Sequence, residues 1–436
     1  MTQSATTKKP TQDLGAKGWL MVVYLFLCFY LSPSISSGWQ NFIGFWADTY
    51  AWDTTWLMSL LSIGQVICIG TCFLFPRMVS RVPLHNIQLV LAAITTVCLF
   101  ILPHISNYVL MCVVEVLLIC SVITWVYGLN PILIARWFPH KKGIVMGIVT
   151  IAVPLGAGTI SKIVSFIGNL WGLNYGCMFS AVLSVAALVL LVTFVKDYPE
   201  DAGYAPDNDR SLSSEEIARM QAEVKAQDAR SPWTVARMIQ VKETWIIGLT
   251  IGAAGLFGGG VMSTNFLFML SIGYEASTAG NLMLFTALCG CVFSYLFGLL
   301  DAKKSPRIAT MVVFVCAILS SVFCILAQRT GSLPLLIVGL ALAGAVVGGA
   351  ANFLTSLTAE YWGPANFARA YSVIYPINQI ISSMGVLFIT QISTNFGGYA
   401  ASYSALLVLE TLALLLFATV KDGRFVKKAE AKWNAE

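Results

Sequence analysis

Residues 108–134 read YVLMCVVEVLLICSVITWVYGLNPILI, and Glu115 is the one charged residue in these 27 positions. A helix of about 20 predominantly apolar residues crosses the hydrocarbon core of a bilayer. The stretch is long enough for a complete crossing and too apolar for the surface of a soluble protein. It therefore predicts a membrane-spanning helix.

Eleven further apolar runs lie on either side of this stretch. Across the chain 57% of the residues are hydrophobic and 11% are charged, whereas about 25% are charged in soluble domains. This composition excludes a soluble globule and a disordered chain. The net charge of +5 comes from cations scattered between the runs, which excludes nucleic-acid binding. The sequence predicts an all-α membrane protein with twelve transmembrane helices, spans one to twelve: 18–45, 54–75, 84–102, 108–134, 143–167, 175–195, 244–269, 277–300, 308–327, 333–357, 370–391 and 399–420.

The positions of Lys and Arg predict the orientation. With a cytoplasmic N-terminus, 24 of the 26 Lys and Arg residues fall in cytoplasmic segments, and Arg329 outside and Lys162 within span five remain. Cytoplasmic loops carry such an excess. We therefore expect a multi-pass protein of the cell inner (plasma) membrane with both termini cytoplasmic, whose first span is retained because no cleavable signal precedes it.

A long polar segment, residues 196–243, separates six spans from six. Its SSEE at residues 213–216 is typical of a capping box and is followed by apolar residues at helical spacing, which predicts a short amphipathic helix. This helix either lies on the inner membrane face or serves in a tether between the halves. The predicted domains are a cytoplasmic tail, an N-terminal six-helix bundle, a cytoplasmic linker, a C-terminal six-helix bundle and a second cytoplasmic tail: 1–17, 18–195, 196–243, 244–420 and 421–436.

The two halves carry related segments. RWFP at residues 136–139 follows span four, and EYWGP at residues 360–364 follows span ten. Each places an aromatic pair and a proline where the chain turns back into the membrane. Six plus six spans joined by a long inner loop is the plan of transporters that rock two bundles about a central site.

Two segments resemble a known family. GLLDAKKSPR at residues 298–307 is similar to the short G-x-x-x-D-[RK]-x-G-[RK]-[RK] loop of the major facilitator superfamily. RWFPHKKGIVMG at residues 136–147 resembles the R-W-F-P-D-[KR]-[KR]-G-x-x-x-G stretch of the oxalate/formate antiporter family, with His140 where that pattern has Asp. The resemblance implies the major facilitator fold, with two pseudo-symmetric six-helix bundles, and a carrier of small carboxylates.

The chain also departs from this family. Oxalate-handling members, which this chain resembles, place an Arg in span eight and a Lys in span eleven, where the two cations hold a dianion. Here these positions fall near Phe293 and Ser294 and near Asn378, and neither span contains Lys or Arg. An unpaired buried charge costs roughly several kcal/mol. We therefore expect a monoanion, a zwitterion or an uncharged solute rather than oxalate.

Three ionisable residues lie within spans, namely Glu115, Lys162 and Glu410, and such residues are functional candidates. Glu115 and Lys162 lie at matching depths, about 10 and 8 Å from the outer side. They either form a buried ion pair, or Lys162 anchors a substrate carboxylate while Glu115 couples transport to protons. Glu410 lies in span twelve, which the family fold usually places outside the cavity, so a packing contact and a coupling role both stay open.

The resemblance further implies that spans one, four, seven and ten line the cavity and that spans two, five, eight and eleven flank it. Buried amides there need partners, which a ligand or a neighbouring helix supplies. We also expect Pro33 to kink span one and Pro376 to break span eleven. The predicted substrate-binding residues are Ser36, Trp39, Gln40, Gln65, Trp125, Asn130, Lys162, Asn265, Asn352, Tyr375, Asn378 and Gln379.

Little in the sequence indicates catalysis or a cofactor. All eleven Cys lie in apolar runs, and with three His in the chain we expect no metal and no cofactor. No nucleotide loop and no nucleophile–base constellation indicates an enzyme. Our first hypothesis is a monomeric secondary active transporter in the lipid bilayer, moving a small organic acid or related metabolite by exchange or proton symport. An exporter of amphipathic or aromatic compounds is the alternative, and a non-transporting membrane sensor is the third.

Overall fold

The computed structural model describes residues 14–139, 141–208, 215–216, 219, 222, 231, 233–421 and 423–434. Within this part of the chain the regular structure is helical and contains no strand. The helices of the N-terminal half are α1 (Gly15–Leu31), η1 (Ser32–Ile35), α2 (Ser37–Tyr50), α3 (Thr54–Arg81), α4 (Leu84–Ile101), η2 (Leu102–His104), α5 (Tyr108–Val122), η3 (Ile123–Leu129), α6 (Asn130–Trp137), α7 (Lys142–Thr150), α8 (Ala152–Trp171) and α9 (Leu173–Thr193).

Short helices in the linker precede the C-terminal half. The linker contains η4 (Pro199–Ala202), η5 (Pro206–Asn208) and α11 (Val235–Ile239). The helix predicted around residues 213–224 lies largely outside the described residues. The remaining helices are α12 (Lys242–Ser271), α13 (Ala276–Lys303), α14 (Pro306–Thr330), α15 (Leu333–Ser382), α16 (Gly385–Asn395), α17 (Tyr399–Ala418) and α18 (Arg424–Asn434).

These helices confirm the all-α fold with twelve spans. Ten helical segments of the described chain are long and apolar enough to cross a membrane, and α3 and α9, with 28 and 21 residues, complete the twelve. α15 supplies span ten and most of span eleven, because the chain turns between them at Gly363. The φ of 70° at Gly363 lies in the left-handed region, which glycine enters without a steric penalty.

Spans one and four change helix type along their length. The 3₁₀ turn η1 separates α1 from α2, which confirms the kink predicted from Pro33. In span four, η3 is a π-helix, a rare element that marks functional sites. The break predicted at Pro376 is wrong, since α15 continues to Ser382 with Gly363 as its one non-helical residue. A transmembrane helix tolerates proline where its neighbours satisfy the freed backbone groups.

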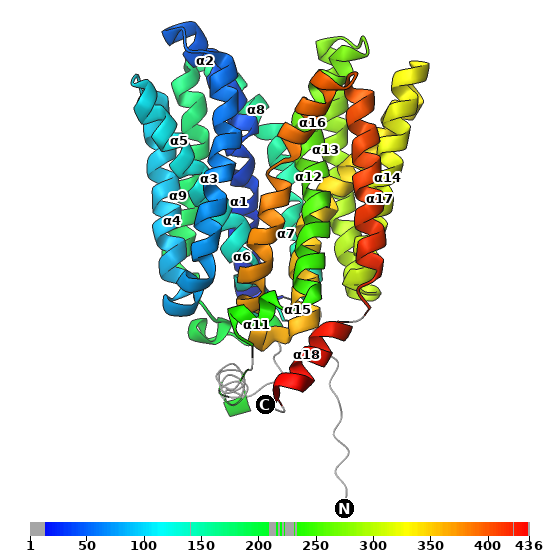
Figure 1. Cartoon of the computed structure of the whole chain (residues 1–436). Coiled ribbons are helices and arrows are strands. Elements are labelled where there is room, and N and C mark those ends of the chain that lie inside the picture. The colour runs from blue at the N-terminus through cyan, green and yellow to red at the C-terminus, as the bar shows by residue number, and fades with distance from the viewer. Residues whose placement is uncertain are drawn as a thin grey trace, which may run out of the picture.

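The two halves stand side by side, and the start of α1 and the helix α18 lie at the same end of the molecule (Figure 1). We call this end the termini end, and its cytoplasmic location stays a prediction. Across the interface α7 packs against α13, and α3 packs against α15. The halves splay apart toward the opposite end, the open end (Figure 1). The exact domain boundaries likewise stay a prediction.

Candidate functional site

A cavity of about 850 Å³ lies between the two halves. The N-terminal half contributes residues of α1, η1, α3, η3, α6, α7 and α8 to its wall, and the C-terminal half contributes residues of α12, α13, α15 and α16. Its volume is in the range of sites that hold small organic molecules. The cavity thus occupies the interface that the two halves would open and close.

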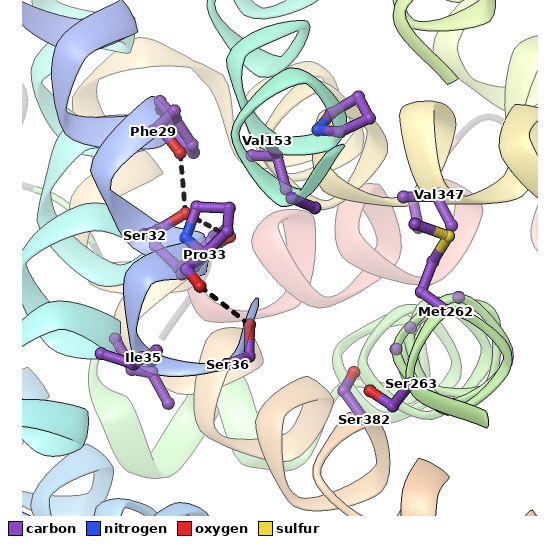
Figure 2. A pocket seen from close by; sticks show the side chains of 18 of the residues that line it. Phe29, Ser32, Pro33, Ile35, Ser36, Val153, Met262, Ser263, Val347 and Ser382 are labelled. Carbon is purple, nitrogen blue, oxygen red and sulfur yellow. Dashed lines mark hydrogen bonds between the residues drawn. The ribbon is translucent and has the colours of Figure 1, made fainter. Parts of the chain in front are cut away.

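The wall of the N-terminal half is polar where span one is interrupted. Ser32 Oγ donates to the carbonyl oxygen of Phe29 at 2.8 Å and lies 2.8 Å from the hydroxyl of Tyr127. Because Ser32 has a single proton, Tyr127 is the donor in the second bond. Ser36 Oγ donates to the Pro33 carbonyl at 3.2 Å (Figure 2). The interruption therefore brings hydroxyl groups to the cavity that a continuous apolar helix would lack.

The opposite wall is formed mainly by small and apolar residues. Met262 and Ser263 of α12 and Val347 and Ser382 of α15 lie across from span one (Figure 2). Phe266 extends the same wall along α12. A ligand would thus meet hydroxyl groups on one side and an apolar surface on the other.

Lys162 carries the one formal charge among the described residues of the cavity wall. Among the described lining residues it is the only Lys, Arg, His, Asp or Glu, and its side chain is exposed. It comes from α8. The cavity therefore offers a single fixed positive charge in otherwise neutral surroundings.

Two stacked tyrosines form the floor of the cavity toward the termini end. The hydroxyl of Tyr371 donates to the carbonyl of Tyr127 at 2.8 Å, and that of Tyr375 donates to the carbonyl of Ile123 at 3.3 Å. Their rings lie 5.6 Å apart at 18°. Both acceptors belong to the π-helix η3, so the floor joins span eleven of one half to span four of the other.

Below the floor the halves touch directly. Thr150 donates to Asn352 Oδ1 at 2.6 Å and lies 2.7 Å from the hydroxyl of Ser294. A Cβ atom on Gly147 would lie 2.9 Å from the Cα of Gly298, so α7 and α13 meet backbone to backbone. These contacts close the termini end, whereas the halves splay apart toward the open end (Figure 1).

An acidic residue completes this contact at the start of α7. Asp301, at the end of α13, is buried and accepts a hydrogen bond from Ser356 of its own half. A Cβ atom on Gly143 would lie 2.7 Å from Asp301 Oδ2, which places the carboxylate against the first turn of α7. A negative charge at a helix N-terminus is stabilised by the helix dipole. The motif residues Gly143, Gly147 and Asp301 thus meet across the interface.

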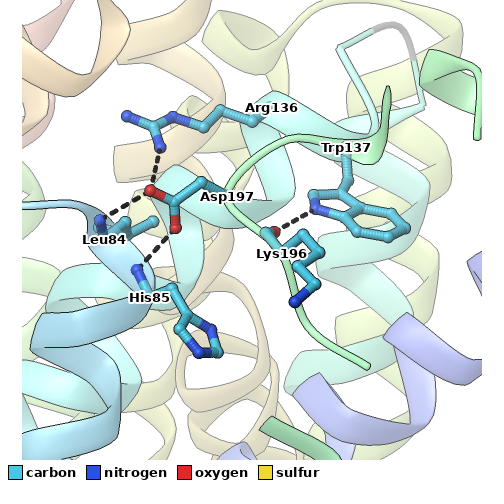
Figure 3. Close-up of polar contacts among 6 residues, drawn as sticks. All are labelled: Leu84, His85, Arg136, Trp137, Lys196 and Asp197. Carbon is cyan, nitrogen blue, oxygen red and sulfur yellow. Dashed lines mark hydrogen bonds and ion pairs between the residues drawn. The ribbon is translucent and has the colours of Figure 1, made fainter. Parts of the chain in front are cut away.

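The RWFP segment has a structural role at the termini end of the N-terminal half (Figure 3). Asp197 accepts from the backbone N–H groups of Leu84 at 2.9 Å and His85 at 2.6 Å, and its Oδ2 lies 3.9 Å from Arg136. Trp137 Nε1 donates to the Lys196 carbonyl at 3.0 Å. These contacts tie the end of span four and the start of the linker to the first turn of α4.

The structure divides the predicted binding residues into two groups. Six of the twelve line the cavity, namely Ser36, Gln65, Lys162, Tyr375, Asn378 and Gln379. Five others lie outside its wall, namely Trp39, Trp125, Asn130, Asn265 and Asn352. The side chain of Gln40 lies outside the described part of the chain. Substrate binding by the lining residues stays a prediction.

The five that do not line the cavity have partners within the protein. Trp39 donates to the Leu57 carbonyl and Trp125 to the Tyr24 hydroxyl, each at 3.1 Å. Gln88 donates to Asn130 at 2.9 Å, Tyr403 donates to Asn265 at 2.7 Å, and Asn352 accepts from Thr150 below the floor. Neighbouring helices use these groups, since most buried polar groups in proteins have a hydrogen-bond partner.

Several cavity residues were not identified from the sequence, namely Ser32, Ser263, Tyr371, Ser382 and Ser383. Ser32 flanks Pro33, so the kink itself was the available signal. Tyr371 lies four residues before Tyr375 and therefore shares its helix face. The serines of α12 and α15 give no such signal, because hydroxyl groups are common in transmembrane helices as bonds to the preceding turn.

Glu115 and Glu410 lie away from the cavity. Both are completely buried, and none of their carboxylate oxygens has a hydrogen-bond partner among the described residues. Of the two alternatives for Glu115 and Lys162, the buried ion pair is therefore not formed. α5, which carries Glu115, packs on α3 and α4, whereas Lys162 reaches the cavity. A coupling role for either acid stays a prediction.

Two membrane bundles with a ligand-sized cavity between them define a transporter of the rocking-bundle class. A sequence model of the Major Facilitator Superfamily matches residues 122–386, more than half of the chain, and the chain belongs to this family. It is 25% identical over 311 residues to the oxalate:formate antiporter of Oxalobacter formigenes, covering 70% of this chain and 68% of that protein.

Solved structures support the same fold. The proton:xylose symporter XylE bound to 6-bromo-6-deoxy-D-glucose is similar with a TM-score of 0.78 at 13% identity, covering 95% of this chain and 98% of that one. The human organic anion transporter MFSD10 (TETRAN) is similar with a TM-score of 0.67 at 15% identity, covering 92% and 99%. At these identities the two structures demonstrate a shared fold alone.

Proposed function

We propose that this chain is a secondary active transporter for a small organic acid that carries one negative charge. The observation that supports this proposal is Lys162, the single charged residue in the described wall of the cavity. One cation compensates one carboxylate, whereas a second carboxylate would stay unpaired in surroundings of low dielectric constant. The similarity to an oxalate:formate antiporter supports a carboxylate as substrate.

The surroundings of Lys162 favour a substrate with a small organic body. Ser32, Ser36 and Gln65 offer hydrogen bonds on one wall, and Met262 and Val347 offer apolar contact on the other. A monocarboxylate would place its charge toward Lys162 and its remaining atoms between these walls. The cavity volume of about 850 Å³ leaves room for such a molecule and for several waters.

Transport would follow from rocking of the two halves about this site. In the proposed cycle the substrate enters from the open end, the halves close above it, and the contacts below the tyrosine floor separate. Coupling is by exchange or by proton symport, with Glu115 and Glu410 as the candidate proton carriers. We place the chain in the plasma membrane as a monomer with both termini in the cytoplasm.

Counterflow into proteoliposomes tests the substrate class. Labelled uptake of a monocarboxylate should accelerate when the vesicles are preloaded with a monocarboxylate, and a dicarboxylate should compete weakly. Lys162→Met should raise the substrate concentration at half-maximal uptake by about 10- to 100-fold, which corresponds to the loss of a charge-assisted hydrogen bond. Lys162→Arg should retain part of the affinity. Arg329→Met is the matched control, since Arg329 is an exposed cation on α14 outside the cavity wall. Unchanged half-saturation in Lys162→Met would refute the proposed role.

An exporter of amphipathic or aromatic compounds is the second candidate. Phe29, Met262 and Phe266 give the cavity an aromatic and apolar surface, which suits a flat organic molecule. This candidate predicts uptake inhibition by aromatic amines or neutral aromatics that does not depend on Lys162. The same variants therefore separate the two functions.

A further inference from the structure

The C-terminal helix α18 is fixed to the C-terminal half rather than extending from it (Figure 1). Glu243 Oε1 accepts from the backbone N–H groups of Phe425 at 2.6 Å and Val426 at 3.3 Å, which satisfies the first turn of α18. Val426 is 1% exposed, and the ring of Trp433 packs edge-on against Trp233 at 5.3 Å. One face of α18 is thus held by the protein.

The first turn of α18 lies at the level where a membrane span begins. Glu243 is in the first turn of α12, and Lys242 Nζ lies 5.5 Å from the ring centroid of Phe425. Trp245, three residues later, is 45% exposed, and exposed tryptophans at the ends of spans occupy the headgroup region of a bilayer. The five residues that join α17 to α18 extend at most about 18 Å, so α18 stays near this interface.

The face of α18 turned away from the protein is cationic. Arg424, Lys427, Lys428 and Lys432 are all exposed. The three lysines follow Arg424 by three, four and eight residues, which places all four cations along one side of the helix. Within α18 the one acidic residue is Glu430. A helix whose apolar side is occupied and whose exposed cations begin beside the start of a membrane span is complementary to anionic lipid.

We propose that α18 is a docking surface for anionic lipid headgroups, bound through Arg424, Lys427, Lys428 and Lys432. The lysine side chains reach along the interface with their ammonium groups at the lipid phosphates. Because Glu243 joins α18 to the start of α12, which lines the cavity, bound lipid also stabilises that end of the C-terminal half.

A lipid titration of the purified full chain in neutral detergent tests this proposal. The midpoint of thermal unfolding is followed while phosphatidylglycerol or phosphatidylcholine is added, since a ligand of the folded state raises it by mass action. We expect phosphatidylglycerol to act at lower concentration than phosphatidylcholine and its effect to weaken with salt. In Lys427→Gln/Lys428→Gln the apparent affinity for phosphatidylglycerol should fall about 30-fold, roughly fivefold for each cation.

Lys303→Gln/Lys304→Gln is the matched control, because it removes the same charge from exposed lysines at the termini end of the same half. We expect this variant to retain most of the affinity. Equal losses in the two variants would show general attraction of lipid to a basic surface and would overturn the proposal. Equal effects of the two lipids, or full replacement of phosphatidylglycerol by soluble glycerol phosphate, would overturn it as well. All four lysines are exposed, so neither variant endangers folding.

Discussion

The closed termini end depends on the contact between α7 and α13, and Gly298→Ala perturbs that contact directly. A Cβ atom at residue 298 would lie 2.9 Å from the Gly143 carbonyl oxygen and 2.9 Å from the Gly147 Cα. Carbon atoms in normal contact are about 3.5–4.0 Å apart. The added methyl group would therefore force the two helices apart by about 0.6–1 Å as long as this end is closed.

The magnitude follows from the cost of overpacking, about 1–3 kcal/mol. This cost arises in the closed-end state alone, because α7 and α13 separate when the end opens. The higher helix propensity of alanine, about 1 kcal/mol, is gained in both states and cancels. We therefore expect the equilibrium to shift toward the state with an open termini end by about 5- to 150-fold.

Spin-label distance measurements report this shift. Arg81→Cys and Lys304→Cys place labels at exposed positions of the termini end, one on each half, in a background without other reactive cysteines. Adding Gly298→Ala should move population from the shorter to the longer distance. Gly70→Ala is the control, since no atom lies within 4 Å of a Cβ atom there, and it should leave the distribution unchanged. The reasoning fails if Gly298→Ala behaves like this control.

Two further changes test separate contacts. Asp197→Ala removes the acceptor for the N–H groups of Leu84 and His85 and should lower the free energy of unfolding by about 0.5–2 kcal/mol, measured by thermal or denaturant unfolding; a loss no greater than that of the exposed Asp201→Ala would contradict the capping role. Glu115→Gln should fold at least as well as the parent, because the carboxyl group is buried without a partner, and it should abolish the pH dependence of uptake in proteoliposomes. Retained pH dependence would exclude Glu115 as the proton carrier.

The fold was accessible from the sequence because the lipid environment imposes a coarse and strong pattern. A span must be long, apolar and helical, since its backbone has no other hydrogen-bond partners in hydrocarbon. The run at residues 108–134 meets these conditions although its helix changes type at η3. Backbone irregularities inside a span were accessible only where proline marked them, as at Pro33, and Pro376 shows that proline alone does not decide.

The cavity residues were only partly accessible, because a span that is apolar on all sides gives little indication of its orientation about its own axis. Lys162 and Gln65 reach the cavity, whereas Trp125 and Asn265, which also carry polar groups in cavity-forming spans, turn toward neighbouring helices. The sequence shows that a polar group needs a partner, but it does not show whether that partner is a helix or a ligand. Tertiary packing decides this point.

The hydrogen bonds that close the termini end are weak enough for one small substrate to influence them. Tyr371 and Tyr375 each donate one hydrogen bond across the interface, and Thr150 contacts Asn352 and Ser294. A single hydrogen bond contributes about 0.5–1.5 kcal/mol, so these hydrogen bonds together contribute a few kcal/mol to closure. A ligand shifts a conformational equilibrium by no more than its difference in affinity for the two states, and a charge-assisted hydrogen bond contributes about 1.5–3 kcal/mol. Lys162 could hold a single carboxylate more tightly in one state than in the other. The resulting difference in binding free energy is similar in size to the free energy of the hydrogen bonds that must separate. The cycle therefore does not require a doubly charged substrate held by two cations.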